Sequence, residues 1–395
     1  MARMNLERVV VSRRGAARWR QVGHPWIYRS DVVRPAPLEA GAVQVVDEAG
    51  ARVGVALWSG ASQIALRLLG GWDTVPDGTF WRDRIAAAVE YRRVLAPAAT
   101  AYRLVHGEAD GLPSLVVDRY GEYLVVQLLS AGLETFRSEI VQALLEVCRP
   151  HGMLARNDVP VRRLERLQEE IELLYGEVPE ELEVREHDVV YRAAPWSGQK
   201  TGAFLDQRES RARAGELAHG RALDCFSYHG SFALHLAGNA EHVTAVDSSA
   251  GALARAERNA ALNGDRGGRI DFVEANAFDF LRAQDDTGER YDIIVVDPPA
   301  FAKRKDAVAA ALRGYKELNL RALRLLNPGG ILCTFSCSYH MSPWLFREML
   351  EGAASDAGRP VRWLEWRGQS ADHPEILQIP ESAYLKGAVL QAVAR

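Results

Sequence analysis

The sequence predicts an α/β protein that ends in a doubly wound parallel sheet and begins with a smaller β-rich domain. From about residue 190 onward, short apolar strands alternate with helical stretches, the pattern of a parallel sheet covered by helices. Residues 1–70 instead contain short β segments divided by Gly, Pro and Asp turns, with little helix signal. The length of 395 residues allows two to three domains.

Composition places the chain among ordinary globular proteins. Hydrophobic residues make up 48% and charged residues 25%, which excludes a mostly disordered chain. No apolar run reaches the roughly 20 residues that a membrane-spanning helix needs, and we expect no signal peptide. The four cysteines show neither a disulfide framework nor the spacing of a zinc site. We therefore expect a cytoplasmic enzyme with reduced cysteines, no metal and no membrane partner.

Charge is distributed unevenly along the chain. The formal net charge of −4 argues weakly against nucleic acid, but residues 1–34 hold eight arginines against only Glu7 and Asp31. Residues 165–188 hold ten acidic residues against two arginines. We interpret this acidic run as a solvated helix face or a linker. A whole-chain net charge therefore does not exclude a basic face in the first domain.

Lysine is rare in this sequence. Only five of the 48 basic residues are lysines: Lys200, Lys303, Lys305, Lys316 and Lys386. Because an ammonium and a guanidinium differ in geometry and hydration, a lysine in such a chain marks a position that arginine does not fill.

The first domain, residues 1–72, is predicted to be a small β-barrel. Arg13 and Arg14 lie in its basic segment, and Trp26 and Tyr28 follow shortly after. Basic and aromatic side chains together suit RNA, whose phosphates need cations and whose bases stack. The alternative is that both aromatic residues belong to the core of the barrel.

The second domain, residues 73–185, is predicted to be a small α+β unit. The expected elements are a helix within 75–100, a pair of hairpins with turns at Gly111 and Gly121, and a helix over 133–148. We interpret Glu108 and Asp110 as turn residues and not as a catalytic pair of carboxylates.

The third domain, residues 186–395, carries the alternating pattern. Its expected strands are 222–226, 242–247, 270–275, 292–297, 330–336, 361–366 and 388–394. The first four are short, apolar and bounded by turns, as buried parallel strands are. In such a sheet, ligands bind at the carboxyl ends of the strands.

The first two of these strands end in acidic residues. Asp224 lies at the end of the first strand, and Gly230 opens a helix in a position where the backbone can approach a ligand. Asp247 ends the second strand and is placed to accept both hydroxyls of a cofactor ribose. The alternative for Asp247 is an N-cap of the following helix.

The next three strands end in further polar groups. Asn276 follows the third strand, where it could bind an adenine. Asp297-Pro298-Pro299 follows the fourth, and the two prolines fix the backbone so that the acid points rigidly into the site. Cys337 lies where the fifth strand ends and is a candidate nucleophile, whereas Cys333, inside that strand, is predicted to be a core residue. We interpret His340 as a loop residue.

The sequence resembles the bacterial large-subunit rRNA cytosine-C5 methyltransferases that carry an N-terminal PUA domain. The resemblance spans almost the whole chain, including HPWIYRSDV near the start and HGEADGLPSLVVDRYGEYLVVQ in the middle. The other segments that carry it are SGQKTGAFLDQR (197–208), LDCFSYHGSFALH (223–235), AVDSSAGALARAERNAALNG (245–264), VVDPPAFAKRK (295–305), GYKELN (314–319), GGILCTFSCSYHM (329–341) and PESAYLKG (380–387). It implies a PUA barrel, a central α+β domain and a seven-stranded, Rossmann-like class I methyltransferase domain.

The resemblance also assigns a cofactor, S-adenosylmethionine, and residues that bind it. The methionine end is assigned to the 224–230 loop, the ribose to Asp247, and the adenine to Asn276 with Ala277. The full cofactor set is Phe204, Asp224, Phe226, Ser227, Tyr228, Gly230, Asp247, Ser248, Asn276, Ala277 and Asp297.

By the same resemblance, Cys337 is the catalytic nucleophile and Asp297 holds the flipped target base. The RNA-binding set is Lys200, Pro298, Pro299, Arg13, Arg14 and Trp26, with Lys200 contacting either RNA phosphate or cofactor. The partner implied is 23S rRNA or an assembling large subunit, and relatives of this kind suggest a homodimer.

The chain departs from the family pattern in two places. It has Tyr-His-Gly-Ser where relatives usually show Tyr-Thr-Gly-Gly, and Asn276 where class I enzymes more often place Asp. Methylation of a purine amine, methylation of uridine at carbon 5 and a non-catalytic role in ribosome assembly remain alternatives. Against the first, Ala300 stands where such enzymes place a stacking aromatic residue. Against the second, Ser338-Tyr339 replaces the Asn-Pro that usually follows the cysteine.

Overall fold

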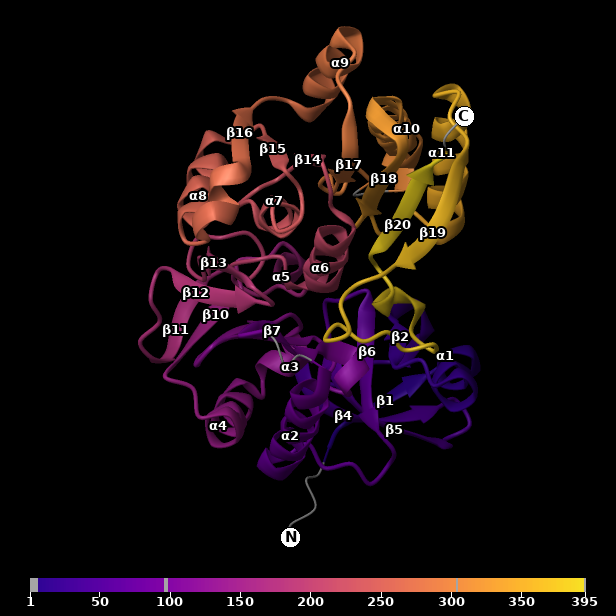
Figure 1. The fold of residues 1–395 in the computed structure, drawn as a ribbon. Helices are drawn as coiled ribbons and strands as arrows, with labels where there is room; N and C mark the ends of the chain where they lie inside the picture. The colour runs from indigo at the N-terminus through magenta and orange to yellow at the C-terminus, as the bar shows by residue number, and fades with distance from the viewer. Residues whose placement is uncertain (1–5, 96–98, 303–304, 394–395) are drawn as a thin grey trace. The chain divides into compact units, whose positions relative to one another are not determined.

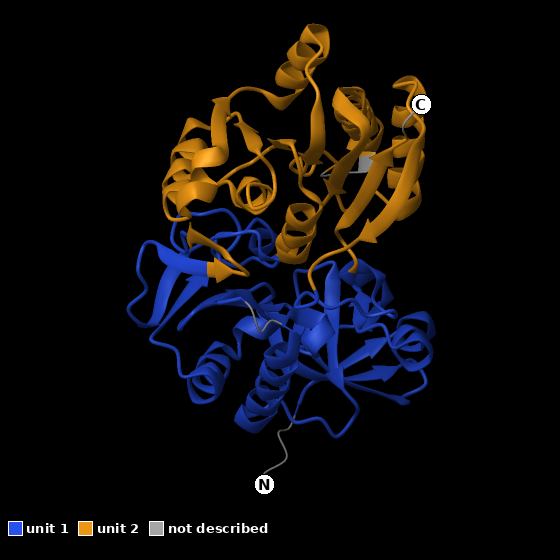
Figure 2. Cartoon of the chain, viewed as in Figure 1, with its two compact units in different colours: residues 1–184, 193–205, 371–382 blue, residues 185–192, 206–370, 383–395 orange. Residues whose placement is uncertain are grey.

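A computed structural model describes residues 6–95, 99–302 and 305–393, and it divides into two compact units (Figures 1 and 2). Unit 1 comprises residues 1–184, 193–205 and 371–382, and unit 2 comprises residues 185–192, 206–370 and 383–395. Arg3, Lys303 and the side chain of Lys305 lie outside the described residues. The domain limits predicted after residues 72 and 185 stay a prediction.

The N-terminal part of unit 1 is a six-stranded sheet. Its strand order is β2-β6-β5-β4-β1-β3. The strands are β1 (Arg8–Val11), β2 (Trp26–Tyr28), β3 (Val32–Arg34), β4 (Ala40–Asp47), β5 (Arg52–Ser59) and β6 (Ile64–Gly70). Val43 and Val45 of β4 are fully buried while Gln44 between them is partly exposed, the period of two that a half-buried strand needs. The prediction of a β-rich segment is confirmed.

Helical turns that the sequence did not indicate interrupt this sheet. They are α1 (Arg13–Ala17), the π-helical turn η1 (Arg18–Val22) and the 3-10 turn η2 (Arg29–Asp31). The Ser12 hydroxyl begins α1 by accepting a hydrogen bond from the backbone amide of Gly15 at 3.1 Å. One such turn is too short to produce a helical hydrophobic period, so only its cap marks it in the sequence.

The central part of unit 1 is a five-stranded sheet with the order β11-β10-β9-β8-β7. Its strands are β7 (Ala101–His106), β8 (Leu115–Tyr120), β9 (Tyr123–Leu128), β10 (Gly152–Arg156) and β11 (Ile171–Gly176). Its helices are α2 (Gly78–Leu95), η3 (Gly107–Asp110), α3 (Ala131–Glu134), α4 (Arg137–Cys148) and α5 (Val161–Leu164). Trp81 of α2 and Ile140 of α4 share one buried core with Val117 and Val126 of the sheet. The predicted helices and hairpins are confirmed.

The acidic run of residues 165–188 contains no helix, so its interpretation as a helix face is wrong. The run forms β11, which is largely exposed, and β12 (Leu182–Glu186), which pairs with β13 (Val189–Ala193). Two of its acids are buried in ion pairs. Glu165 accepts from Arg67 at 2.9 Å, and Glu186 accepts from Arg211 at 2.6 Å. Both arginines lie outside the run, so the charge pattern of residues 165–188 alone does not predict these ion pairs.

Unit 2 contains a seven-stranded sheet with the order β16-β15-β14-β17-β18-β20-β19. The strands are β14 (Arg221–Cys225), β15 (His242–Asp247), β16 (Ile270–Glu274), β17 (Tyr291–Val296), β18 (Leu326–Ser336), β19 (Val361–Arg367) and β20 (Lys386–Ala392). The first five are parallel to one another, and β20 runs antiparallel to both of its neighbours. All seven predicted strands are confirmed, and the order reverses at β14, which has β15 on one side and β17 on the other.

Helices cover both faces of this sheet (Figure 1). The helices are α6 (Arg208–Leu217), α7 (Ser231–Leu236), α8 (Ala250–Ala261), α9 (Ala277–Thr287), α10 (Val308–Leu325) and α11 (Pro343–Asp356). The 3-10 turns of this part of the chain are η4 (Leu205–Gln207), η5 (Gly264–Arg269) and η6 (Lys305–Ala307), and η7 (Pro380–Ser382) lies in unit 1. Leu223 and Cys225 pack into one core with α9, α10 and α11. Asp224 therefore points to the opposite face, where it accepts the Ala233 amide of α7 at 3.0 Å. Within the described residues, no helix has the length and apolar character to cross a membrane.

Candidate active site

The structure brings five predicted residues to one edge of the sheet of unit 2. Strands β14 to β18 are parallel, so their carboxyl ends meet at the same edge. Asp224 and Asp247 lie at the ends of β14 and β15, and Asn276, Asp297 and Cys337 follow β16, β17 and β18. The reversal of strand order at β14 lies in the middle of this set, the position where open α/β sheets bind ligands.

The loop after β14 is bent by three residues in the left-handed region. Phe226, Tyr228 and Gly230 have φ values of 64°, 54° and 83°. A Cβ on Gly230 would also lie 3.0 Å from the Cβ of Ala256, so both backbone angle and space require glycine there. A positive φ is unfavourable for the non-glycine residues Phe226 and Tyr228, so the surrounding structure must stabilise it. Such backbone strain is typical of ligand-binding loops.

Asp224 is buried beneath this loop. Its Oδ2 accepts from the Ser227 hydroxyl at 2.6 Å and from the Ala233 amide at 3.0 Å, whereas its Oδ1 is buried with no hydrogen-bond partner among the described residues. Burial raises the pKa of Asp224 to about 7, and the negative charges of Asp297 and Asp247 add to that rise, while the two hydrogen bonds oppose it. The three carboxyl groups are therefore close enough to influence one another.

Asp247 fixes the loop from the neighbouring strand. Its Oδ2 accepts the backbone amide of Tyr228 at 2.9 Å, and its Oδ1 accepts the amide of Ser249 at 2.9 Å. The alternative that Asp247 is the N-cap is wrong, because the Ser249 hydroxyl caps α8. Ser248, between them, is exposed.

Asn276 is the N-cap of α9. Its Oδ1 accepts the amide of Phe278 at 2.9 Å, so the oxygen that we expect to face an adenine already binds a backbone amide. Ala277, the first residue of α9, is buried. The cap function gives Asn276 a structural role beside any role in binding.

Asp297 and Cys337 follow neighbouring strands. Val296 of β17 pairs with Thr334 of β18, and the next residues along each strand lead to Asp297 and Cys337. Both side chains are half-buried; Pro298 is buried and Pro299 is exposed. Among the described residues, no group of His, Cys, Asp and Glu has an arrangement that would hold a metal ion.

The four cysteines have different environments. Cys333 is 1% exposed and burial raises its pKa to about 12, which confirms it as a core residue. Cys225 is also fully buried, whereas Cys148 and Cys337 are half-buried. Of these two, Cys337 lies at the carboxyl edge of the sheet.

A cluster of polar groups holds the chain directly after Cys337. The Ser338 hydroxyl accepts the amide of Ala302 at 3.1 Å and lies 2.9 Å from the Tyr315 hydroxyl. The Ser338 carbonyl accepts from the Lys386 ammonium at 2.7 Å. Ser338, Tyr315 and Lys386 were not predicted as site residues, although each lies in a segment that carries the resemblance and Lys386 is one of only five lysines.

Lys200 and Phe204 lie in unit 1, whereas the other predicted cofactor residues lie in unit 2. Lys200 is exposed, and its Nζ lies 4.6 Å from the centre of the Phe204 ring. Their predicted contacts with cofactor or RNA stay predictions.

Some of the predicted RNA-binding side chains near the N-terminus already make contacts within unit 1. Arg13 and Arg14 are exposed on α1, and Arg14 Nε donates to the buried Asp31 at 2.8 Å. Trp26 is half-buried, and its indole donates to Glu108 at 2.8 Å. The indole of Trp26 is therefore held by a second part of unit 1 and is neither a core side chain nor a freely exposed one.

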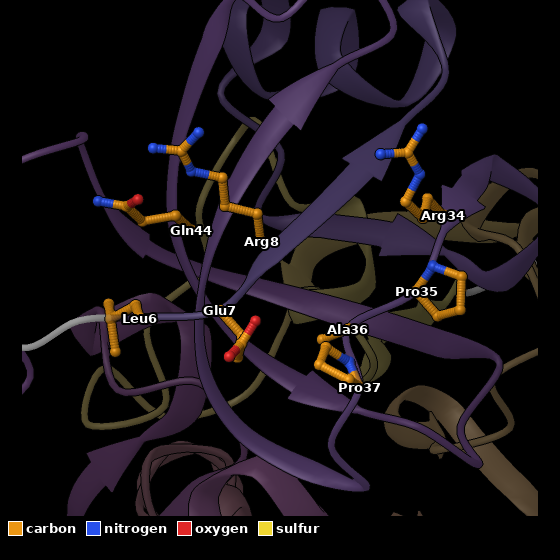
Figure 3. A pocket seen from close by; sticks show the side chains of 8 residues that line it. All are labelled: Leu6, Glu7, Arg8, Arg34, Pro35, Ala36, Pro37 and Gln44. Atoms are coloured by element: carbon orange, nitrogen blue, oxygen red, sulfur yellow. The ribbon is translucent and has the colours of Figure 1, made fainter.

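A pocket lies in the N-terminal part of unit 1 (Figure 3). Arg8 of β1 and Arg34 of β3, two strands that pair, line it together with Glu7 and Gln44. Its volume is about 660 Å³. The basic character of residues 1–34 is visible in the sequence, but which arginines line one pocket is not.

Comparison with known proteins identifies relatives over nearly the whole chain. A family model described as S-adenosylmethionine-dependent methyltransferase matches residues 103–389, and one described as a PUA-like domain matches residues 9–70. Ribosomal RNA large subunit methyltransferase I from Tolumonas auensis is 42% identical over 382 residues, which cover 94% of this chain and 96% of its own length. The protein of the same name from Klebsiella pneumoniae is 41% identical over 378 residues, covering 92% and 93%.

Two solved structures share the fold. A methyltransferase complexed with SAH has a TM-score of 0.85 at 23% identity, covering 98% of this chain and 100% of its own. A SAM-dependent methyltransferase from Streptococcus mutans has a TM-score of 0.81 at 22% identity with the same coverage. These similarities confirm the α/β methyltransferase fold with its N-terminal PUA-like domain.

Proposed function

The chain belongs to the family of S-adenosylmethionine-dependent methyltransferases that includes Ribosomal RNA large subunit methyltransferase I, and from that premise we propose that it methylates carbon 5 of a cytosine in 23S rRNA. One observation carries the choice of carbon 5 over a purine amine, and Ser338-Tyr339 in place of Asn-Pro favours cytosine over uridine. A half-buried cysteine, Cys337, lies at the carboxyl edge of the sheet, beside the strand that ends in Asp297. Methylation of a purine amine needs no such thiol.

The residues at the carboxyl edge fit the cofactor of this family. The buried Oδ1 of Asp224 has no hydrogen-bond partner among the described residues, and an ammonium group such as that of the methionine end would supply one. Gly230 keeps the start of α7 open to a ligand. Asp247 is placed to accept the ribose hydroxyls, Ser248 adjoins it, and Asn276 with Ala277 would contact the adenine. The proposed cofactor-binding set is completed by Phe226, Ser227, Tyr228 and Phe204.

Cys337 is proposed to activate the base. Carbon 5 of cytosine is a poor nucleophile, so the thiolate adds to carbon 6, a C–S bond forms, and the electron pair of the 5,6 double bond moves toward carbon 5. S-adenosylmethionine, when bound, supplies the methyl group that carbon 5 takes up. A base then removes the carbon-5 proton, the double bond re-forms, and the C–S bond breaks to release the thiolate.

Asp297 is proposed to hold the target base during these steps. Its carboxylate can accept from the exocyclic amine of cytosine, and in the protonated form it can donate to the ring. Pro298 and Pro299 restrict the backbone after it, so the acid keeps a fixed direction. A cytosine in a stacked helix is shielded, and the substrate must therefore present it single-stranded or flipped out.

Unit 1 is proposed to bind the RNA. Its PUA-like segment bears Arg13, Arg14 and Trp26, and the pocket lined by Arg8 and Arg34 lies in the same unit. Lys200 is a further candidate for a phosphate contact. The partner is large-subunit rRNA, free or in an assembling subunit. Cytoplasmic location and a homodimer are expectations that accompany this proposal.

The test is the Cys337→Ala variant assayed on unmodified large-subunit rRNA with radiolabelled S-adenosylmethionine. We expect loss of methyl transfer, by a factor of at least about 10³ for removal of a covalent nucleophile, with cofactor binding unchanged. Cys148→Ala, which removes the half-buried cysteine of unit 1, is the matched control and should keep activity.

Nucleoside analysis of the product separates the alternatives. 5-Methylcytosine supports the proposal, whereas an N-methylated purine or 5-methyluridine would replace it. Absence of any transfer by the wild-type protein to rRNA or to large-subunit precursors would favour a non-catalytic role in assembly.

A further inference from the structure

Lys386 is a buried cation of unit 2 that lies next to the end of β18, close to the residues that follow Cys337. It begins β20, pairs with Ser336 at the end of β18, and is 3% exposed. Its Nζ donates to two backbone carbonyls, those of Ser338 and Tyr384, each at 2.7 Å. Neither acceptor carries a charge, so these contacts satisfy hydrogen bonds without neutralising the ammonium.

The ammonium is coupled to the thiol of Cys337. Burial lowers the pKa of Lys386 to about 8, and a negative charge on Cys337 opposes that shift. Lys386 binds the carbonyl of Ser338, the residue directly after Cys337, and this contact places the ammonium near the cysteine. At neutral pH the lysine is therefore mostly protonated, and its charge favours the thiolate form of the cysteine.

Other titratable groups face the same place. Tyr315 of α10 hydrogen-bonds to Ser338, and its pKa is raised by burial and further by Cys337. Asp297 follows the neighbouring strand and as a carboxylate would oppose a thiolate. The phenol of Tyr384, whose carbonyl binds Lys386, donates to Asp206 at 2.8 Å. A neutral phenol and a carboxylate do not stabilise a thiolate by charge, whereas the ammonium does.

We propose that Lys386 is a positioning residue that stabilises the Cys337 thiolate electrostatically and fixes the chain beside it. This inference rests on the proposed role of Cys337 as nucleophile. The thiolate is the reactive form of cysteine, and a nearby cation increases its population near neutral pH. The arrangement also accounts for a lysine in an arginine-rich chain, because a compact ammonium with three donors binds two convergent carbonyls where a planar guanidinium needs more width.

The test measures the reactivity of Cys337 without RNA or cofactor. The folded protein is alkylated with iodoacetamide between pH 6 and 10, and mass spectrometry follows the Cys337 peptide. In Lys386→Gln, which keeps a hydrogen-bond donor but loses the charge, we expect the pH midpoint to rise by about one unit, so that alkylation at pH 7 slows about tenfold. The rate at high pH should be unchanged.

Two controls separate charge from structure. Lys316→Gln removes a lysine of α10 whose Nζ pairs with Asp356 at 2.7 Å on the surface, and should leave the profile unchanged. Tyr315→Phe removes a hydrogen bond to Ser338 without removing a charge. If Lys386 only holds Ser338 in place, this variant and Lys386→Gln should behave alike; our proposal expects the midpoint to move only in the lysine variant.

An unchanged midpoint in Lys386→Gln, or an equal loss of alkylation at every pH, would overturn the electrostatic role. Failure of the proposed function is a separate result, because full methyl transfer by Cys337→Ala would refute the nucleophile and leave the alkylation profile untouched.

Discussion

Asp247 accepts a hydrogen bond from the backbone amide of Tyr228 at 2.9 Å, so the acid that ends β15 holds the loop that follows β14. The second oxygen of the same carboxylate accepts the amide of Ser249 at the start of α8. The Asp247 side chain therefore links the loop before α7 to the start of α8, and both segments border the proposed cofactor site. Its removal affects both the ribose contact that we propose and the shape of the loop.

We expect Asp247→Ala to weaken S-adenosylmethionine binding about 10- to 100-fold, because hydrogen bonds to a charged group contribute about 1.5–3 kcal/mol. Isothermal titration calorimetry measures this directly. Asp271→Asn, at an exposed acid of β16, is the control and should bind normally. Normal binding by Asp247→Ala would contradict its place in the site.

We expect Asp224→Asn to stabilise the protein more at pH 8 than at pH 5. Since the folded-state pKa of Asp224 is raised to about 7, the folded state keeps a proton that the unfolded chain has already lost near pH 4. Wild-type stability attributable to Asp224 therefore falls between about pH 4 and 7 and stays low above that, whereas asparagine does not titrate.

Thermal melts of both proteins across this pH range measure the effect. The difference in Tm should grow with pH and level off above about pH 7. A difference that is constant from pH 5 to 8 would show that Asp224 does not titrate in this interval.

We expect Glu186→Gln to destabilise the protein by about 3–5 kcal/mol, the usual cost of breaking a buried ion pair. Glu186 lies between Arg211 at 2.6 Å and His235 at 3.0 Å, and all three side chains are buried. Burial alone would raise the pKa of Glu186, but the Arg211 charge and the His235 hydrogen bond hold it well below its usual value.

The stability that Glu186 contributes is present above the unfolded-state pKa near 4.5 and falls as the pH drops below it. Urea unfolding at pH 7 measures the loss in Glu186→Gln. Glu183→Gln, at an exposed position of the same strand, should cost little. Equal effects of the two variants would mean that the ion pair contributes nothing specific.

We expect the pair Arg8→Gln and Arg34→Gln to reduce the salt dependence of binding to an rRNA fragment. Each lost phosphate contact should lower the slope of log K against log salt by about 0.7 to 0.9. Arg93→Gln on α2, an exposed arginine paired with Glu90, is the control. Fluorescence anisotropy at several salt concentrations gives the slopes. If only Arg13 and Arg14 variants change the slope, RNA binds over α1 and not at the pocket.

Much of the fold follows from local patterns in the sequence. Strands β14, β15 and β17 of unit 2 are visible as short apolar runs, because a buried strand needs apolar side chains on both faces, whereas β19 alternates half-buried and exposed residues. The helices α2 and α4 are visible from their apolar spacing. By contrast, α1 and η1 are too short for any period. The interpretation of the acidic run 165–188 as a solvated helix face or a linker missed the buried ion pairs of Glu165 and Glu186, because their partners lie elsewhere in the chain.

The candidate site divides in the same way. Asp224, Asp247, Asp297 and Cys337 could be chosen from the sequence because each marks a strand end, and parallel strand ends meet at one edge. The sequence could not predict that Asn276 caps a helix or that Trp26 binds Glu108. The residue type is the same whether the side chain forms such an internal contact or binds a ligand.

The sequence by itself determined the order of strands and helices, the residues at the carboxyl edge and the resemblance to a methyltransferase family. Only the tertiary structure decided that Lys386 lies against the residue after Cys337, that Asp224 is buried with a raised pKa, and that Arg8 and Arg34 share a pocket. The physical reason is that hydrophobic period and turn chemistry act between near neighbours in the chain, whereas desolvation and charge act between atoms that folding brings together from distant segments.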